Sequence, residues 1–287
     1  MRCGTSVPGN PALIHGGMKM LLRCPVCADA LMREDTAWRC PAGHSFDIAR
    51  QGYVNLLPSG QKHSRNPGDS RMAVQARRSF LDGGWYAPLA RRVAELAAAE
   101  RPSVVLDAGC GEGYYLGAVG RACPQAQRVG VDISKDAVRY AAGRDKAALW
   151  LTASAAALPL ADQSCQVLLC LFAYAFPAEF ARVTAPGGLY VQVLAGERHL
   201  EALREVIYPT VFERDKARPE TPAGFAPAGH ERLDIPFTLE DPAQIAALLA
   251  MTPHYWRIGK EGAARAAALT RLEDAARMEL YLWRREG

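Results

Sequence analysis

The sequence predicts an α/β fold with a mostly parallel sheet, preceded by a small module that contains cysteines. Three observations support this prediction. Short apolar and β-branched runs, beginning with Val104–Leu106, alternate with stretches whose apolar residues recur at helical spacing, which is typical of βαβ units. A segment with three glycines follows that first run almost directly. Four residues of kinds that bind metals gather ahead of it, between positions 24 and 44.

Length and charge limit what the protein can be. With 287 residues, 49% of them hydrophobic, the chain can bury one large core beside a small satellite. The formal net charge of +4 is mild, so a nucleic-acid partner would have to meet a local basic patch rather than the whole surface. The composition therefore predicts a stable globular protein.

The cysteines and the N-terminal segment indicate the compartment. No run of about eighteen apolar residues predicts a membrane span, and Met1–Leu22 lacks the apolar centre of a signal peptide. We therefore expect a cytoplasmic protein without a membrane partner, in which eight cysteines favour metal ligands and buried thiols over disulfides. Residues 1–20 are rich in glycine and proline, so we expect a flexible tail, with Cys3 outside any metal site.

Residues 21–60 carry a metal-binding pattern. Cys24-Pro-Val-Cys27 and Cys40-Pro-Ala-Gly-His44 give C-x2-C, twelve intervening residues and C-x3-H, the spacing of two tight turns that close on one tetrahedral Zn²⁺. Four ligands leave no open position for catalysis, so the expected role is structural or in recognition. Chance thiols in a loop are the alternative, but so short a segment has too little core to fold without such a staple. We interpret it as a zinc-binding, RNA-recognition module.

Residues 61–100 combine a basic stretch with two helices. A solvated face is one explanation of the positive charge, but beside a zinc module it also suits contacts to phosphates. Helical spacing predicts Ala73–Leu81 and Leu89–Ala99, separated by Asp82-Gly83-Gly84. Between Gln61 and Arg78 there is a single acid, Asp69, and the basic residues are Lys62, His63, Arg65, Arg71, Arg77 and Arg78.

Residues 101–287 form the predicted large domain, whose first strand is followed by a predicted ligand site. Asp107 at the end of that strand and Glu112 in the turn would repel phosphates and favour a cationic ligand. No Gly-Lys-Ser/Thr follows, which excludes a nucleoside triphosphate loop. Three glycines let the backbone turn sharply into a helix: Gly109, Gly111 and Gly113.

A second carboxylate completes the pattern. Arg128–Asp132 reads as the next strand, and Asp132 comes at the spacing expected of an acid that binds ribose hydroxyls. Leu-Asp-Ala-Gly-Cys-Gly-Glu-Gly followed by Gly-Val-Asp-Ile-Ser resembles the class I S-adenosylmethionine-dependent methyltransferases. The resemblance implies a Rossmann-like sheet and S-adenosyl-L-methionine as the cofactor. An ordinary core without a ligand is the alternative, and the two halves of the pattern together argue against it.

The remaining elements follow the same pattern. We expect Ser134 to cap a helix, and Pro209–Pro236 to be a flexible flap over the substrate because proline, glycine and charge are frequent there. A further helix is expected at Asp241–Met251, and Met278–Arg284 should be the last, antiparallel strand. The other expected elements are the strands Leu149–Thr152, Gln166–Phe172 and Leu189–Leu194 and the helix Glu179–Val183.

The exit of the fourth strand, Ala173-Tyr-Ala-Phe-Pro177, should face the transferred methyl group. It lacks the Asn/Asp-Pro-Pro-aromatic signature that methyltransferases acting on exocyclic amino groups carry. The absence argues against adenine or cytosine amino groups and fits a ring nitrogen. Core packing is the alternative for Tyr174 and Phe176.

A more specific resemblance spans the chain from about Cys24 to the C-terminus. The zinc pattern, Gly-Tyr-Val-Asn-Leu-Leu-Pro, Arg-Asn-Pro-Gly-Asp-Ser, Gln-Ala-Arg-Arg-Ser-Phe-Leu-Asp-Gly-Gly-Trp-Tyr and the glycine motif, with Tyr114 after it, occur in the order found in bacterial 23S ribosomal RNA (guanine-N1)-methyltransferases. The family resemblance implies that Tyr86 and His199 lie near the cofactor, and resemblance to the class implies the same of Ser154 at the adenine edge. From the sequence alone, Tyr86 is an interhelical aromatic, His199 a buried or surface histidine, and Ser154 a helix start.

The leading hypothesis is methyl transfer from S-adenosylmethionine to N1 of a guanine in a hairpin of large-subunit ribosomal RNA, docked by the zinc module. A homodimer that binds one RNA through its two zinc modules fits this hypothesis. A small-molecule methyltransferase with a purely structural zinc module is the main alternative, and an RNA-binding protein with an inactive core is another. No residue is assigned as a catalytic base.

Overall fold

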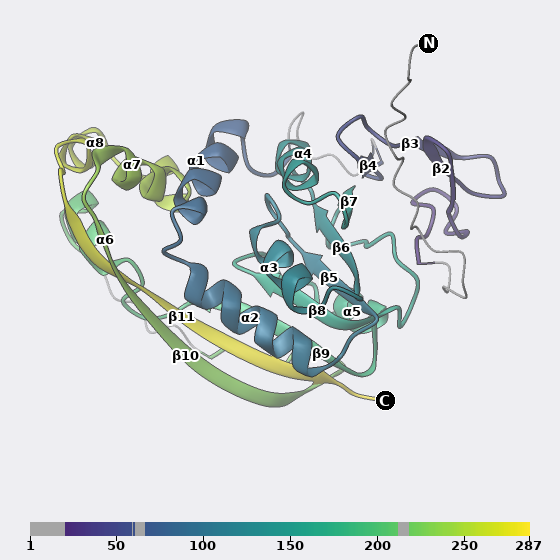
Figure 1. Cartoon of the computed structure of the whole chain (residues 1–287). Helices are drawn as coiled ribbons and strands as arrows, with labels where there is room; N and C mark the ends of the chain where they lie inside the picture. Colours follow the sequence, from purple (N-terminus) through teal and green to yellow (C-terminus); the bar gives the residue numbers. More distant parts are fainter. Residues whose placement is uncertain (1–20, 59, 61–66, 212–217) are drawn as a thin grey trace, which may run out of the picture.

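The computed structural model describes residues 21–58, 60, 67–211 and 218–287. These residues form a three-stranded antiparallel sheet near the N-terminus and an eight-stranded sheet that carries the rest (Figure 1). The small sheet consists of β1 (Met32–Glu34), β2 (Ala37–Arg39) and β3 (Ser45–Asp47). The expected tail, Cys3, and Lys62, His63 and Arg65 of the basic linker lie outside the described residues.

The large sheet confirms the predicted Rossmann-like fold. The strands from β4 to β9 are all parallel, and β11 runs antiparallel to both of its neighbours. The order reverses at the first strand of the domain, which has β6 on one side and β8 on the other, and ligands of such sheets bind at that point. In spatial order the strands are β10 (Phe225–Leu239), β11 (Leu272–Arg285), β9 (Thr184–Ala195), β8 (Cys165–Leu171), β5 (Val104–Ala108), β6 (Gln127–Asp132), β7 (Leu149–Thr152) and β4 (Tyr53–Asn55).

Helices cover both faces of the sheet. Successive residues of a strand point to opposite faces, so each face carries apolar side chains that the helices bury. Val105 and Val167 belong to one buried cluster, which includes residues of α2 (Ala87–Ala99), α3 (Tyr114–Ala122) and α4 (Lys135–Arg144). Leu106 and Leu168, their neighbours in sequence, belong to the other, together with residues of α5 (Pro177–Val183). The strands are thus buried on both faces, which explains their continuous apolar runs.

The predicted helices are present, and their caps explain where they begin. α1 (Arg71–Asp82) starts after Ser70, whose Oγ accepts the Ala73 N–H at 3.3 Å. Ser134 caps α4 as expected, accepting the Ala137 N–H at 3.2 Å. None of the helices in the described part of the chain combines the length and the apolar character that a membrane crossing needs.

The expected flap at Pro209–Pro236 is wrong for its second part, Phe225–Pro236. From Phe225 onward the segment belongs to β10. This strand pairs antiparallel with β11 as far as Leu239, and the two form the long curved strand pair seen in Figure 1. In the sequence, Pro227 and Pro236 argue against a strand. β10 is an edge strand, however, and proline is tolerated there. Residues 212–217 of the expected flap lie outside the described residues.

A group of helices lies at one end of this strand pair, and three of them connect β10 to β11. They are α6 (Glu201–Ile207), α7 (Pro242–Ala250), the 3₁₀ helix η2 (Pro253–Trp256) and α8 (Lys260–Ala267). α7 packs against α1 (Figure 1). This contact brings the segment after α7 toward the carboxyl ends of the central strands.

The zinc module is joined to the large sheet at both of its ends. β4, which the sequence analysis placed with the module, pairs in parallel with β7, so that Tyr53 lies beside Trp150. At the other end, the Arg23 N–H donates to the Pro159 carbonyl at 3.0 Å. The buried side chain of Val54 explains why β4 joins the large core.

Candidate functional site

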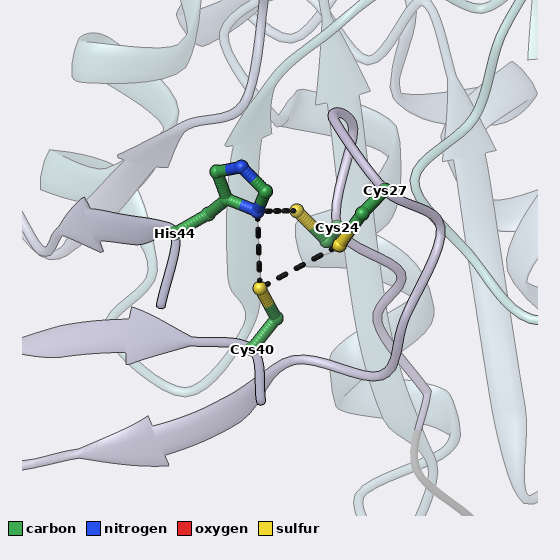
Figure 2. A group of neighbouring side chains, drawn as sticks. All are labelled: Cys24, Cys27, Cys40 and His44. Carbon is green, nitrogen blue, oxygen red and sulfur yellow. Dashed lines mark hydrogen bonds between the residues drawn. The ribbon is translucent and has the colours of Figure 1, made fainter. Parts of the chain in front are cut away.

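Two tight turns form the metal cluster. In the first turn, the Ala28 N–H donates to the Cys24 carbonyl at 2.9 Å, and in the second the Gly43 N–H donates to the Cys40 carbonyl at 2.9 Å. Ala28 and Gly43 have positive φ angles of 63° and 86°, which fold each turn back on itself. As a result Cys24, Cys27, Cys40 and His44 point toward one centre (Figure 2).

The spacing of these side chains fits zinc. His44 Nδ1 lies 3.6 Å from Cys24 Sγ and 3.2 Å from Cys40 Sγ, and the Sγ atoms of Cys27 and Cys40 are 3.6 Å apart. A tetrahedral ion about 2.3 Å from sulfur and about 2.0 Å from nitrogen separates its ligands by about 3.5–3.8 Å. Three soft sulfurs and one imidazole make Zn²⁺ the matching ion, with no open coordination position. Cys110, Cys123, Cys165 and Cys170 are free, buried thiols elsewhere in the chain.

A cavity of about 990 Å³ opens at the carboxyl ends of β5, β6 and β8. It lies at the point where the strand order reverses, the expected place for a ligand. Among the residues predicted to bind the cofactor, those that line it are Tyr86, Asp107, Gly109, Gly111, Glu112, Tyr114, Asp132 and His199. Gly113 and Ser154 do not line it.

The glycine turn is fixed to the neighbouring strand. The N–H groups of Gly109 and Cys110 both donate to the Val131 carbonyl, at 2.8 and 3.0 Å. Gly109 has a φ of +88°, and a Cβ there would lie 2.4 Å from the Ala173 Cβ. Gly113 also has a positive φ, +82°, but the neighbour differs, because a Cβ there would lie 2.6 Å from the Trp150 ring. Gly113 therefore supports packing behind the cavity.

Asp107 is the least satisfied polar group of the cavity. Its side chain is 1% exposed, and neither carboxylate oxygen has a hydrogen-bond partner among the described residues. Burial, together with the negative charge of Asp132, raises the pKa of Asp107 to about 8. A buried carboxylate without a partner is costly, so the site favours a ligand that brings positive charge. The ammonium and sulfonium groups of S-adenosylmethionine meet that requirement.

Asp132 is held in a fixed orientation. Its Oδ2 accepts the Gly111 N–H at 2.9 Å, and its Oδ1 accepts the Ser134 N–H at 2.8 Å. Burial raises its pKa, while these two hydrogen bonds lower it. Each oxygen keeps a lone pair, so two ribose hydroxyls can still donate to this carboxylate.

Glu112 differs from both aspartates, because a protein cation meets its charge. Its Oε2 accepts from Arg144 Nε at 2.7 Å, and Arg144 also donates to Asp82 at 2.7 Å. Burial raises the pKa of Glu112 to about 7, although Arg144 opposes the shift. Glu112 thus links the glycine turn to α4 and α1 in addition to lining the cavity.

The other predicted residues have more varied surroundings. Tyr86 is buried and meets Phe80 edge to face at 5.3 Å between ring centroids. His199 Nδ1 donates to the Arg277 carbonyl at 2.7 Å, which fixes the ring beside the cavity. Ser154 Oγ accepts the Ala156 N–H at 3.2 Å in a local turn, and no helix starts there, unlike the helix start that the sequence analysis gave as the alternative.

Sequence reasoning missed part of the cavity wall. Arg77, read as a phosphate contact of the linker, lines the cavity and is ion-paired with Asp69, which lines it too. The segment from Ala250 to Arg257 also contributes, and it carries no local motif. Its position depends on the packing of α7 against α1, which only the folded structure reveals.

Comparisons with known proteins match both parts of the chain. One family model, described as RlmA, N-terminal, matches residues 22–65, and another, described as a methyltransferase domain, matches residues 105–188. The chain is 36% identical over 261 residues to a 23S rRNA (guanine(748)-N(1))-methyltransferase of Streptomyces fradiae, a match that covers 86% of this chain and 90% of the relative. It is 39% identical over 211 residues to a protein of Micromonospora griseorubida provisionally named 23S rRNA (guanine-N(1)-)-methyltransferase, covering 66% of this chain and 70% of that one.

Proposed function

The chain belongs to the family of 23S rRNA (guanine-N1)-methyltransferases, and from this premise we propose that it methylates N1 of a guanine in a hairpin loop of large-subunit ribosomal RNA. It is an enzyme that uses S-adenosyl-L-methionine, and its N-terminal module binds zinc. The observation that carries the proposal is the pair of aspartates, Asp107 buried and Asp132 half-buried, in one cavity beside the glycine turn.

Two carboxylates would hold different parts of the cofactor. Asp107, which has no partner for either oxygen among the described residues, would accept the positive charge of the methionine end. Asp132, already oriented by two backbone N–H groups, would accept the ribose hydroxyls. The remaining proposed contacts surround these two: Tyr86, Gly109, Gly111, Glu112, Tyr114 and His199. Gly113 would act through the shape of the turn, and Ser154 stays a prediction at the adenine edge.

Positioning accounts for most of the expected catalysis. The cofactor supplies a sulfonium methyl group that is ready for in-line displacement, so the protein has to hold the nucleophile on that line. Guanine N1 lies on the pairing edge and carries a proton at neutral pH. The base must therefore be unpaired or flipped out, and the proton is lost during or after the attack.

The zinc module would dock the RNA. Arginines are exposed over its surface, where they suit contacts to phosphates: Arg23, Arg33, Arg39 and Arg50. A hairpin loop is the favoured target because its bases can be splayed out, unlike those of a helix. Because ribosomal RNA is the substrate, we place the enzyme in the cytoplasm. The expected homodimer stays a prediction that the mass of the protein in solution tests.

The test is methyl transfer from labelled S-adenosylmethionine to unmodified large-subunit ribosomal RNA, with the product mapped by reverse transcription. We expect one strong stop at a hairpin-loop guanine, because an N1 methyl group blocks base pairing. An Asp107→Asn variant serves as the inactive control. Clear cofactor binding without transfer to RNA would overturn the proposal and favour a small-molecule substrate.

A further inference from the structure

Exposed aromatic side chains are confined to two short segments of the described chain. Five Phe, Tyr or Trp side chains are exposed in it, and none of the five lies outside residues 172–176 and 255–256. They are Phe172 at 43%, Tyr174 at 89%, Phe176 at 37%, Tyr255 at 37% and Trp256 at 65%. Single exposed apolar residues need no explanation, but such a concentration marks an interaction site.

Three of these five side chains line the cofactor cavity. Phe172 and Tyr174 come from the exit of β8, and Trp256 comes from η2, more than eighty residues later in the sequence. The fold therefore brings two separate aromatic segments to one opening. Packing within the core does not explain Tyr174 or Trp256, because most of each side chain is exposed.

The backbone at the exit of β8 is held in an unusual conformation. Phe172 has a φ of 55°, a left-handed value that a bulky residue rarely adopts. Its N–H donates to the Val193 carbonyl at 2.9 Å, which fixes the strand exit against β9. Backbone strain of this kind clusters at functional sites, where it directs a side chain.

The charges near the aromatic residues suit a nucleotide. Arg204 and Arg257 line the same cavity and provide positive charge for phosphates, whereas Arg198, which also lines it, is ion-paired with Glu201. Tyr255 supports Trp256, because their rings meet edge to face at 5.1 Å. Phe176 turns the other way, toward the buried ring of Phe180 at 6.4 Å, and does not line the cavity.

We propose that Tyr174 and Trp256 form the stacking platform for the flipped guanine, with Phe172 beneath it toward the cofactor. Every base has a π face, so aromatic side chains bind an extruded base strongly. The exit of β8 lines the cavity and lies against the glycine turn, where a Cβ on Gly109 would lie 2.4 Å from the Ala173 Cβ, and the nucleophile must stand near this point. This inference rests on the proposed function, because it requires an RNA guanine as substrate.

Variants at the two platform residues test the inference. Tyr174→Ala and Trp256→Ala should each lower kcat/KM for the RNA hairpin by about 5- to 150-fold, the range expected for loss of one base stack. Both should bind S-adenosylmethionine as tightly as the unaltered protein, and Tyr174→Phe should keep most of the activity because it keeps the ring. Phe176→Ala is the matched control, an exposed aromatic of the same segment that faces away, and it should leave kcat/KM unchanged.

A fluorescent base gives a second readout that does not depend on turnover. 2-Aminopurine placed at the mapped guanine should be quenched on binding to the unaltered protein, and less so on binding to Trp256→Ala. If the unaltered enzyme methylates RNA while Tyr174→Ala and Trp256→Ala match it in both readouts, the inference is wrong and the proposed function stands. If the unaltered enzyme transfers no methyl group to RNA, both are overturned.

Discussion

The metal cluster and the cofactor cavity are built in opposite ways. All four cluster ligands come from a span of 21 residues, between Cys24 and His44, in a module whose strands have three residues each. The cavity residues come from Asp69 to Arg257, on elements buried in the large core. In the module two of the few buried side chains, Cys24 and Cys40, are themselves ligands.

The difference teaches which component each site depends on. In the module the ligand supplies the stability that a core would otherwise give, whereas in the large domain the core shapes the site before any ligand arrives. Loss of zinc should therefore unfold a region, and loss of a cavity side chain should change binding while the fold remains. The following changes test that contrast, from the largest expected effect to the smallest.

Removing zinc should have the largest effect. Chelation, or Cys40→Ser, should unfold residues 24–47, since structural zinc contributes about 10–16 kcal/mol of binding free energy at pH 7. Hydrogen exchange should show loss of protection there, and RNA methylation should fall at least about 100-fold. S-adenosylmethionine binding should persist, because none of the described residues of the module lines the cavity. Full protection of the module without zinc would contradict the comparison.

Asp107→Asn should weaken cofactor binding without unfolding the domain. The change keeps the shape of the side chain but removes the charge that meets the cationic ligand, which we expect to cost about 2–5 kcal/mol of binding free energy. The denaturation midpoint should stay the same or rise, because Asp107 is buried in the free protein and has no hydrogen-bond partner in the described part of the chain. Calorimetric titration and urea denaturation measure both quantities. An unchanged Kd would show that Asp107 does not meet the cofactor.

Breaking the Glu112–Arg144 pair should affect stability more than binding. Arg144→Met leaves the buried Glu112 carboxylate without its cation, and we expect a loss of about 2–3 kcal/mol of unfolding free energy. Glu112→Gln should cost less, because Arg144 keeps Asp82 as a partner. Urea denaturation of the two variants compares these losses. The reverse order would mean that the pair does not act as a buried ion pair.

Cofactor affinity should rise with pH between about 6 and 7.5. The pKa of Asp107 is raised to about 8, and a cationic ligand binds the charged form of its carboxylate. Below about pH 8 the cofactor can bind only after Asp107 has lost its proton. The Kd of the cofactor should therefore fall by up to about tenfold for each pH unit. The effect on stability has the opposite sign. The free folded protein keeps a proton that the unfolded chain loses above about pH 4, so this contribution to stability falls as pH rises toward 8.

Glu112, whose pKa is about 7, titrates in the same range, so the pH profile needs a control. The difference between the unaltered protein and Asp107→Asn isolates the contribution of Asp107. Parallel profiles for the two proteins, measured by calorimetry at several pH values, would exclude Asp107 as the titrating group.

Ser154→Ala should have the smallest effect. The hydroxyl accepts a local N–H and does not line the cavity, so we expect unfolding free energy to change by no more than about 0.5 kcal/mol and cofactor affinity to stay the same. Ser134→Ala is the matched comparison, because that hydroxyl caps α4 and donates to the Asp69 carbonyl, and it should cost about 1 kcal/mol. A clear loss of cofactor affinity in Ser154→Ala would restore Ser154 to the adenine edge.

Local pattern was enough to predict most of the sheet. The expected strand Leu149–Thr152 matches β7, and Gln166–Phe172 differs from β8 by one residue at each end, because their apolar runs end at polar residues or turns. β10 was missed because prolines are acceptable only at an edge, and edge position is a property of the whole sheet.

The site was predictable where chemistry and spacing coincide in the chain. The four metal ligands and Asp107 lie within short motifs, so their grouping follows from the sequence. The partner of Glu112 is Arg144, 32 residues away, and the function of Gly113 depends on Trp150. Trp256 reaches the cavity only through packing of α7 on α1. No local pattern specifies such contacts.

The attachment of the zinc module at both ends has a consequence for its entropy. The Arg23 N–H is hydrogen-bonded to the Pro159 carbonyl, and Tyr53 is paired with β7. The chain between them is a loop of about thirty residues, and the large domain already holds its two ends in place. A free chain of that length would lose much more freedom on binding metal. Zinc uptake and release can then occur as a local opening within an otherwise folded protein, while the anchored ends return the module to one fixed position against β7.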